Sequence, residues 1–199
     1  MLRMYDASSL VIDTLCDWAK GQNVAVSCFY FDFAVQKDQS PTAILCSLLK
    51  QVVSGLENIP AKLVQAFRDE NKTTGGRRPE LAQVVEMLQD ILSSRPAFMC
   101  IDALDECMDE YRANLLDSLE QILSKSLDTR IFLAGRLHVR GEVEKHLSGI
   151  VVAVSITTTR DDIIRFLRAK LNQDTTPLVM DESLKEDIMK TIPETVSEM

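Results

Sequence analysis

The apolar positions along this chain follow two periods, one typical of helices and one typical of buried strands. Eight stretches have helical spacing, and Gly21 after the first and Ser40-Pro41 before the second are typical helix end and start signals. The predicted helices cover about residues 10–20, 41–53, 60–71, 79–94, 109–124, 139–146, 163–171 and 182–192. The last helix is predicted to stop near Pro193, which has no backbone N–H to donate.

Short apolar runs between these helices predict four strands, at about residues 24–31, 96–102, 131–134 and 151–155. Helices that alternate with short strands are typical of a parallel sheet covered by helices on both faces. The sequence therefore predicts a three-layer α/β fold. Residues 72–78, rich in Thr, Gly and Arg, are predicted to form a surface loop. Thr159 and Asp162 resemble a capping box before the helix at 163–171.

Three carboxylates follow the second predicted strand. Residues 97–101 are apolar without alternation, as in a strand covered on both faces, and Asp102, Asp105 and Glu106 come directly after them. Parallel sheets bind ligands at the carboxyl ends of their strands. We therefore expect Asp102 to hold Mg²⁺, and Asp105 or Glu106 to orient or deprotonate an attacking water. The alternative is that these acids begin a solvated loop and favour the first turn of the next helix.

A cation follows the third predicted strand. Arg136 comes directly after the apolar run 131–134 and Gly135. If this strand lies beside the acidic one, Arg136 faces the same crevice and could contact the γ-phosphate of a nucleotide. The alternative is an arginine that extends its apolar stem along the end of a strand and keeps its charge in water.

The loop that usually cradles phosphates is missing from the sequence. A phosphate loop of the form G-x-x-x-x-G-K-[ST] needs glycine followed by lysine, and none of the seven glycines has lysine next to it. The pair Gly75-Gly76 has no strand before it and is interpreted as part of a surface loop. The sequence therefore predicts half of a nucleotide site.

Composition and charge exclude several kinds of partner and cellular location. The 199 residues carry a net charge of −8, which opposes binding to nucleic acid. The five cysteines are odd in number and lack C-x-x-C spacing, so we expect buried free thiols rather than disulfides or a zinc site. No apolar run is long enough to span a membrane, and no signal peptide is evident. We expect a cytoplasmic protein with no nucleic-acid or membrane partner.

Four blocks of the sequence together resemble a NACHT domain, a member of the STAND class of P-loop NTPases. They are residues 24–33, 40–52, 101–107 and 131–136, and the block containing Asp102-Ala103-Leu104-Asp105-Glu106 is the most specific of them. More narrowly, the blocks resemble the nephrocystin-like N-terminal modules of fungal NOD-like receptors, which often precede repeat regions. The resemblance covers about residues 8–190.

The resemblance implies a role for each candidate residue. Asp102 matches the Walker B aspartate that binds Mg²⁺ beside ATP or GTP, and Asp105 and Glu106 match additional acids of the family. Arg136 matches the sensor-1 arginine. The resemblance also implies a nucleotide-binding core over residues 1–157 and the start of a helical lid subdomain over residues 158–199.

The P-loop and the first sheet strand of such domains have no counterpart in the sequence. Met4 stands roughly where the P-loop lysine belongs. Because backbone N–H groups and that lysine hold the phosphates, we expect triphosphate binding to be lost or very weak.

We therefore expect a fragment of a nucleotide-dependent oligomerisation switch that is not itself an enzyme. The alternatives are an active Mg²⁺-dependent NTPase with an atypical phosphate site, and a nucleotide-independent protein-interaction module. The expected partners are related NACHT proteins or a repeat region of the same protein.

Overall fold

A computed structural model describes most of the chain, namely residues 5–56, 58–60, 63–65, 79–126, 128–147, 151–156, 159–173 and 181–197. The chain divides between Val151 and Val152 into two compact units, which are described separately. The predicted boundary between residues 157 and 158 lies six residues further on, and the roles assigned to the two parts stay predictions. Met4 and the predicted loop at 72–78 lie outside the described residues.

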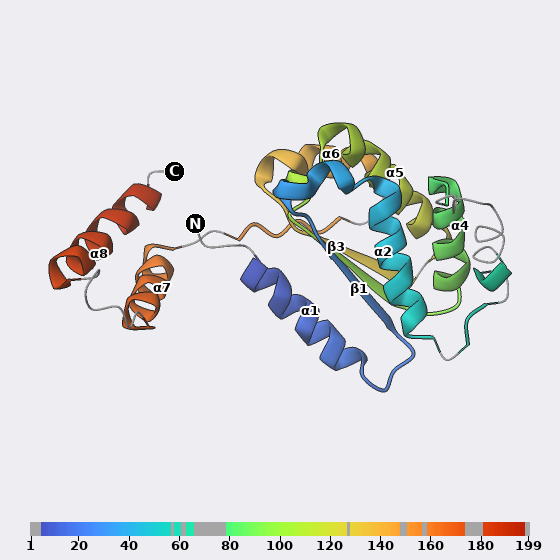
Figure 1. The fold of residues 1–199 in the computed structure, drawn as a ribbon, viewed down its shortest axis with the longest axis horizontal. Coiled ribbons are helices and arrows are strands. Elements are labelled where there is room, and N and C mark those ends of the chain that lie inside the picture. Colours follow the sequence, from blue (N-terminus) through green and yellow to red (C-terminus); the bar gives the residue numbers. More distant parts are fainter. Residues whose placement is uncertain are drawn as a thin grey trace. The chain divides into compact units, whose positions relative to one another are not determined.

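The first unit is built on a parallel sheet, which confirms the predicted α/β fold (Figure 1). Its strands are β1 (Ala25–Tyr30), β2 (Ala97–Asp102) and β3 (Thr129–Leu133), in the order β1-β2-β3. Both pairings are parallel, with Tyr30 opposite Asp102 and Ile101 opposite Leu133. The three strands therefore end together at one edge of the sheet, with β2 in the centre.

The described helices agree with most of the predicted ones. In the first unit they are α1 (Tyr5–Ala19), α2 (Pro41–Ser54), α4 (Leu81–Leu92), α5 (Asp109–Lys125) and α6 (Arg140–His146). Three 3₁₀ helices, η1 (Phe33–Asp38), η2 (Leu104–Glu106) and η3 (Leu137–Val139), follow the three strands. The second unit holds α7 (Arg160–Gln173) and α8 (Glu182–Ser197). Of the helix predicted at 60–71, only residues 63–65 are described as helical.

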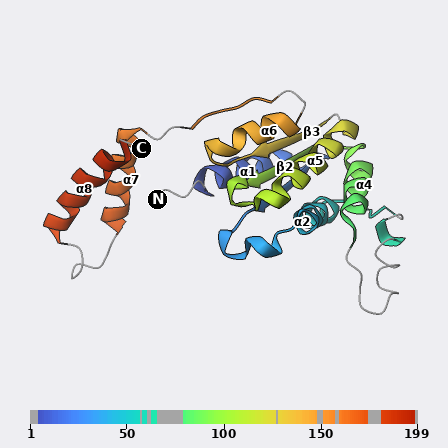
Figure 2. The ribbon, with the colours of Figure 1, turned by 90° about the horizontal axis from the view of Figure 1, so that it is seen from above.

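Helices cover the two faces of the sheet unequally (Figures 1 and 2). On one face, α2, α4 and α5 form a single core with alternate residues of β2, and Leu48, Leu119 and Met99 are fully buried in it. The intervening residues of β2 face the opposite side. There α1 packs against β1 and β2, and Trp18 meets Phe98 edge to face with 5.7 Å between the ring centroids.

Several predicted helix signals are confirmed by hydrogen bonds. The Ser40 hydroxyl accepts from the N–H of Ala43 at 3.3 Å, and Gly21 takes a φ of 75° after α1. The Asp162 carboxylate accepts from the Thr159 hydroxyl at 2.6 Å and from its N–H at 3.1 Å. The hydrogen bond from the Thr159 side chain lowers the pKa of Asp162, so this capping box is strongest when the carboxylate is ionised.

Two predicted elements are wrong. Residues 151–156 form no strand, and Val152, Val154 and Ile156 are 79%, 78% and 81% exposed. A β-rich sequence forms a strand only when it pairs with another strand, and no strand of the described sheet pairs with this segment. The last helix continues through Pro193 to Ser197. Proline removes only one N–H from the helix ladder, and here the helix tolerates that loss.

The five cysteines are free thiols, as predicted, but only two of them are buried. Burial raises the pKa of Cys100 to about 12 and that of Cys107 to about 11, which keeps both thiols protonated and unreactive near neutral pH. Cys16 is exposed, whereas Cys28 and Cys46 are partly buried. Among the described residues, no helix has the length and apolar character needed to cross a membrane.

The outward-facing backbone groups of the two edge strands, β1 and β3, differ in their hydrogen-bond partners. At the β1 edge, the side chain of Gln51 from α2 bonds to both backbone groups of Cys28. Its Nε2 donates to the Cys28 carbonyl at 2.8 Å, and its Oε1 accepts from the Cys28 N–H at 2.9 Å. The amide of Gln51 thus takes the place of a neighbouring strand at this position.

At the β3 edge, backbone groups point away from the sheet. The N–H of Ala134 donates to the carbonyl of Ile101 in β2 at 2.9 Å. Because successive residues of a strand alternate in direction, the N–H and C=O groups of Ile131 and Leu133 point to the other side. No strand in the described part of the chain pairs with them. As far as the described residues go, this edge is therefore free to accept an added strand.

Candidate functional site

The predicted site residues all lie at the carboxyl edge of the sheet, at the end of β2 or in the segments that follow β2 and β3. Asp102 ends β2, while Asp105 and Glu106 form the short helix η2 directly after it. Arg136 lies just beyond β3, next to η3. Because β2 and β3 are parallel neighbours, the acidic cluster and Arg136 come together, as the sequence pattern requires.

Asp102 is buried at the end of the central strand. It is 1% exposed, and its Oδ1 accepts from the N–H of Ala103 at 2.9 Å. Its Oδ2 is buried and has no hydrogen-bond partner among the described residues. Ala103 follows with a φ of 56°, a left-handed conformation that is uncommon for a residue other than glycine. Unpaired buried oxygens and strained backbone are both found more often at functional sites than elsewhere.

Asp105 is joined to the loop after β3. Its Oδ1 accepts from the backbone N–H of Arg136 at 3.1 Å, and its Oδ2 lies 3.2 Å from the Nε of the same arginine. The Asp105 side chain is 9% exposed, whereas that of Arg136 is 58% exposed. The loops also meet through the N–H of Leu104, which donates to the carbonyl of Ala134 at 2.9 Å. Asp105 thus holds two loops together.

Gly135 lies where these two loops meet. A Cβ atom at this position would lie 3.2 Å from Cγ2 of Val139 and 3.4 Å from Oδ1 of Asp105. The first distance is tighter than ordinary van der Waals contact, so the Val139 side chain would have to shift by a few tenths of an ångström, whereas the contact to Asp105 would be ordinary.

Glu106 is joined to the loop on the other side, after β1. Its Oε2 accepts from the N–H of Phe33 at 3.0 Å, and its carbonyl accepts from Nε2 of Gln36 at 3.3 Å. The same loop is held internally by Asp32, whose Oδ1 accepts from the N–H of Ala34 at 2.9 Å. Asp105 therefore binds the loop after β3, and Glu106 binds the loop after β1. The loop after β2 is thus fixed to the loops on both sides of it.

Arg112 is a residue of this site that the sequence analysis missed. It is 7% exposed and donates to the Cys107 carbonyl at 3.1 Å, to Asp109 at 2.7 Å and to Glu142 at 2.6 Å. Burial lowers the pKa of Arg112, but the hydrogen bonds to Glu142 and Asp109 outweigh this and raise it. The guanidinium joins the end of the acidic loop to α5 and α6 and stays charged at every accessible pH.

The position of Arg112 in the sequence does indicate that its side chain is buried. It lies three and four residues before Leu115 and Leu116, so it belongs to the apolar stripe of α5 rather than to the solvated face. A charged residue on such a stripe must have partners when it is buried.

The described residues do not by themselves fit a magnesium–triphosphate site. Mg²⁺ takes six oxygen ligands, and Asp102 offers one unpaired carboxylate oxygen. The carboxylates of Asp105 and Glu106 are already used by the neighbouring loops. In the described ranges, no three His, Cys, Asp or Glu side chains gather closely enough to hold a metal ion. The metal, water-activating and sensor roles of Asp102, Asp105, Glu106 and Arg136 stay predictions.

Comparison with known proteins relates this chain to one family. No curated protein matches it. Among solved structures, a Walker-type ATPase of Pyrococcus abyssi is similar at a TM-score of 0.46 and 11% sequence identity, over 98% of this chain and 65% of that chain. The family described as "Nephrocystin 3, N-terminal" matches residues 7–136, which include all three strands and the acidic cluster through Arg136. The chain therefore belongs to the nephrocystin 3 N-terminal family.

Proposed function

We propose that this chain is part of a NACHT-type signalling NTPase, a nucleotide-dependent oligomerisation switch. We further propose that its 199 residues alone neither bind nor hydrolyse ATP or GTP. One observation carries the second statement: both acids that could activate water are engaged by neighbouring loops, Asp105 by Arg136 and Glu106 by Phe33. A carboxylate that already accepts hydrogen bonds in this way is a poor general base.

The charges at this edge of the sheet also support the proposal that the chain alone does not bind ATP or GTP. A triphosphate brings several negative charges, and the carboxyl edge of this sheet presents Asp32, Asp102, Asp105 and Glu106. Among the described residues, the two arginines of this site are already paired, Arg136 with Asp105 and Arg112 with Asp109 and Glu142. No glycine of the chain precedes a lysine, so the usual phosphate cradle is absent from the sequence. Repulsion between the acids and the phosphates therefore lacks compensation.

The proposal is tested by titrating the purified chain with labelled ATP and GTP, with and without Mg²⁺. We expect no saturable binding up to about 1 mM nucleotide, which corresponds to a binding free energy weaker than about −4 kcal/mol. The Asp102→Ala variant should behave like the unmodified chain. A matched control is Asp17→Ala, which changes an exposed aspartate of α1.

Tight binding would reverse this conclusion. Micromolar binding that needs Mg²⁺, persists in Asp17→Ala and is abolished by Asp102→Ala would favour the active Mg²⁺-dependent NTPase with an atypical phosphate site. Release of inorganic phosphate, measured on the same samples, would then separate binding from hydrolysis.

A second candidate function is a nucleotide-independent protein-interaction module located in the cytoplasm. The open β3 edge favours it, because the backbone groups of Ile131 and Leu133 can pair with an added strand. Related NACHT proteins are the proposed partners, since the net charge of −8 disfavours nucleic acid and anionic membranes.

Co-purification with a full-length relative distinguishes this candidate from both nucleotide-dependent functions. If the chain is an interaction module, binding should survive Asp102→Ala and Arg136→Ala and should not respond to added nucleotide. It should be weakened by Ile131→Pro, which removes an edge N–H that an added strand would need. Binding lost in Asp102→Ala but not in Ile131→Pro would contradict this function.

A further inference from the structure

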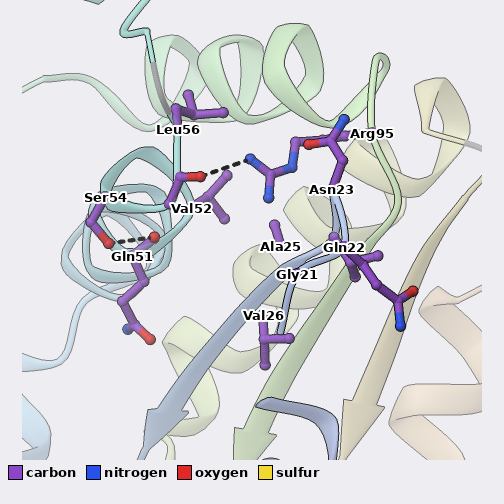
Figure 3. A pocket seen from close by; sticks show the side chains of 12 residues that line it. Gly21, Gln22, Asn23, Ala25, Val26, Gln51, Val52, Ser54, Leu56 and Arg95 are labelled. Atoms are coloured by element: carbon purple, nitrogen blue, oxygen red, sulfur yellow. Dashed lines mark hydrogen bonds between the residues drawn. The ribbon is translucent and has the colours of Figure 1, made fainter. Parts of the chain in front are cut away.

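A cavity lies at the amino end of the sheet, opposite the edge that carries the acids (Figure 3). Its volume is about 750 Å³, and its walls come from the turn before β1, the start of β1, the end of α2 and the residue Arg95 before β2. The strands between the two edges have six residues, which at about 3.3 Å per residue separates the cavity from the acids by about 20 Å. The cavity is therefore distinct from the acidic site.

Among the described residues that line this cavity, Arg95 is the only charged one. It is 7% exposed, and its buried Nε has no hydrogen-bond partner among the described residues. Its single hydrogen bond in the described part of the chain runs from a terminal nitrogen to the carbonyl of Gly55, at 3.5 Å. This distance is beyond the usual range for such bonds, so the guanidinium is poorly satisfied.

Arg112, the other buried arginine among the described residues, has far better hydrogen-bond partners than Arg95. Both arginines are 7% exposed. Arg112 makes three hydrogen bonds of 2.6, 2.7 and 3.1 Å, two of them to carboxylates. A buried charge without a counter-charge is strongly unfavourable, and none of the described residues that line the cavity around Arg95 is acidic. An anion that enters the cavity would satisfy Arg95.

We propose that this cavity binds a small oxyanion, a phosphate or carboxylate group, through the guanidinium of Arg95. The planar fork of arginine matches two oxygens of such a group. Figure 3 shows Arg95 beside the end of α2, with Asn23 on the adjoining wall. The Asn23 side chain is exposed and makes no hydrogen bond within the described part of the chain, so its amide is available as a second donor.

A structural role for Arg95 is the competing explanation. The last turn of α2 has no basic residue, and Arg95 reaches the carbonyl of Gly55 just beyond it. A cation there stabilises the negative end of the helix dipole. In that case Arg95→Met would destabilise the protein in any buffer. If Arg95 instead serves an oxyanion, Arg95→Met should match or exceed the unmodified chain in stability when oxyanions are absent.

Thermal unfolding of the full chain tests the proposal in Tris-chloride buffer at fixed ionic strength, with 10 mM inorganic phosphate or 10 mM acetate added. We expect phosphate to raise the Tm of the unmodified chain by about 3 °C. The shift should vanish in Arg95→Met and be reduced in Arg95→Lys, which keeps the charge but loses the fork. A shift with acetate equal to that with phosphate assigns a carboxylate ligand, and a larger shift with phosphate assigns a phosphate group.

Two further variants keep the test specific. Arg130→Met removes an exposed arginine from the same end of the sheet, and Arg136→Met removes the arginine of the acidic edge. Both should retain the full shift. The same shift in Arg95→Met would identify a general salt effect and overturn the proposal. So would loss of the shift in Arg136→Met, or an Arg95→Met protein that is less stable without oxyanions. Arg95→Lys provides a second comparison, and an undiminished shift in it also overturns the proposal.

Discussion

Replacing Arg112 with alanine is expected to lower the free energy of unfolding by about 3 kcal/mol. The change leaves the Cys107 carbonyl and the largely buried Glu142 carboxylate without their shared partner. The figure is at the low end for breaking a buried ion pair, because Glu142 is 26% exposed and Asp109 is 93% exposed. Urea unfolding followed by the fluorescence of Trp18, the single tryptophan, measures it in the first unit.

Arg140→Ala is the matched control for this experiment. Arg140 pairs with Glu144 at 2.7 Å in the neighbouring α6, but the two side chains are 50% and 46% exposed. Its loss should change the free energy of unfolding by at most about 0.5 kcal/mol. Equal effects of the two substitutions would contradict the view that Arg112 fixes the acidic loop to α6. Arg112→Lys should be nearly as harmful as Arg112→Ala, since an ammonium group cannot reproduce the fork.

The sequence predicts the sheet well because its strands and caps are encoded locally. The run 97–101 is apolar throughout, and it forms the central strand, which has the core with α2, α4 and α5 on one face and α1 on the other. The position of Arg136 after the next apolar run was enough to expect it beside the acids, because parallel strands in one sheet end at one edge. Ser40 and Thr159 set helix starts through hydrogen bonds to residues only three positions away.

What the sequence could not predict depends on contacts between distant residues. Residues 151–155 have the composition of a strand but lack a partner strand in the described structure, and composition says nothing about partners. In the same way, Glu106 bonds to Phe33, 73 positions away, and nothing near either residue in the sequence indicates this. The cavity around Arg95 also joins segments that are far apart in the chain.

The acidic cluster shows most clearly which features the local sequence predicts and which depend on distant contacts. Its residue types and spacing correctly predict where the carboxylates lie, at the end of the central strand. They do not predict that Asp105 and Glu106 accept hydrogen bonds from opposite neighbouring loops. Acids placed for metal chemistry and acids that hold loops together have the same local sequence pattern. Within this cluster, Asp102 keeps one buried carboxylate oxygen without a hydrogen-bond partner among the described residues.

Substitutions of Asp105 and Arg136 should therefore have unequal effects on stability. Asp105→Ala removes both contacts between the loops, to the N–H and to the Nε of Arg136, and should lower the free energy of unfolding by about 2 kcal/mol. Arg136→Ala removes only the contact to the side chain, which is 58% exposed, and should cost about 0.5 kcal/mol. Asp105→Asn should lie between them, because Oδ1 can still accept from the backbone N–H.

These three variants also separate a structural role from a sensor role. If the Arg136 side chain mainly contacts Asp105, the double variant Asp105→Ala with Arg136→Ala should be no less stable than Asp105→Ala alone, since the partner is already gone. If Arg136 instead serves a nucleotide, its loss should leave stability unchanged and abolish any Mg²⁺-dependent binding. Urea unfolding and nucleotide titration of the same four proteins distinguish these outcomes. If Arg136→Ala destabilised the protein as much as Asp105→Ala, the hydrogen bond from the Arg136 backbone N–H to Asp105 would not contribute to stability as we propose.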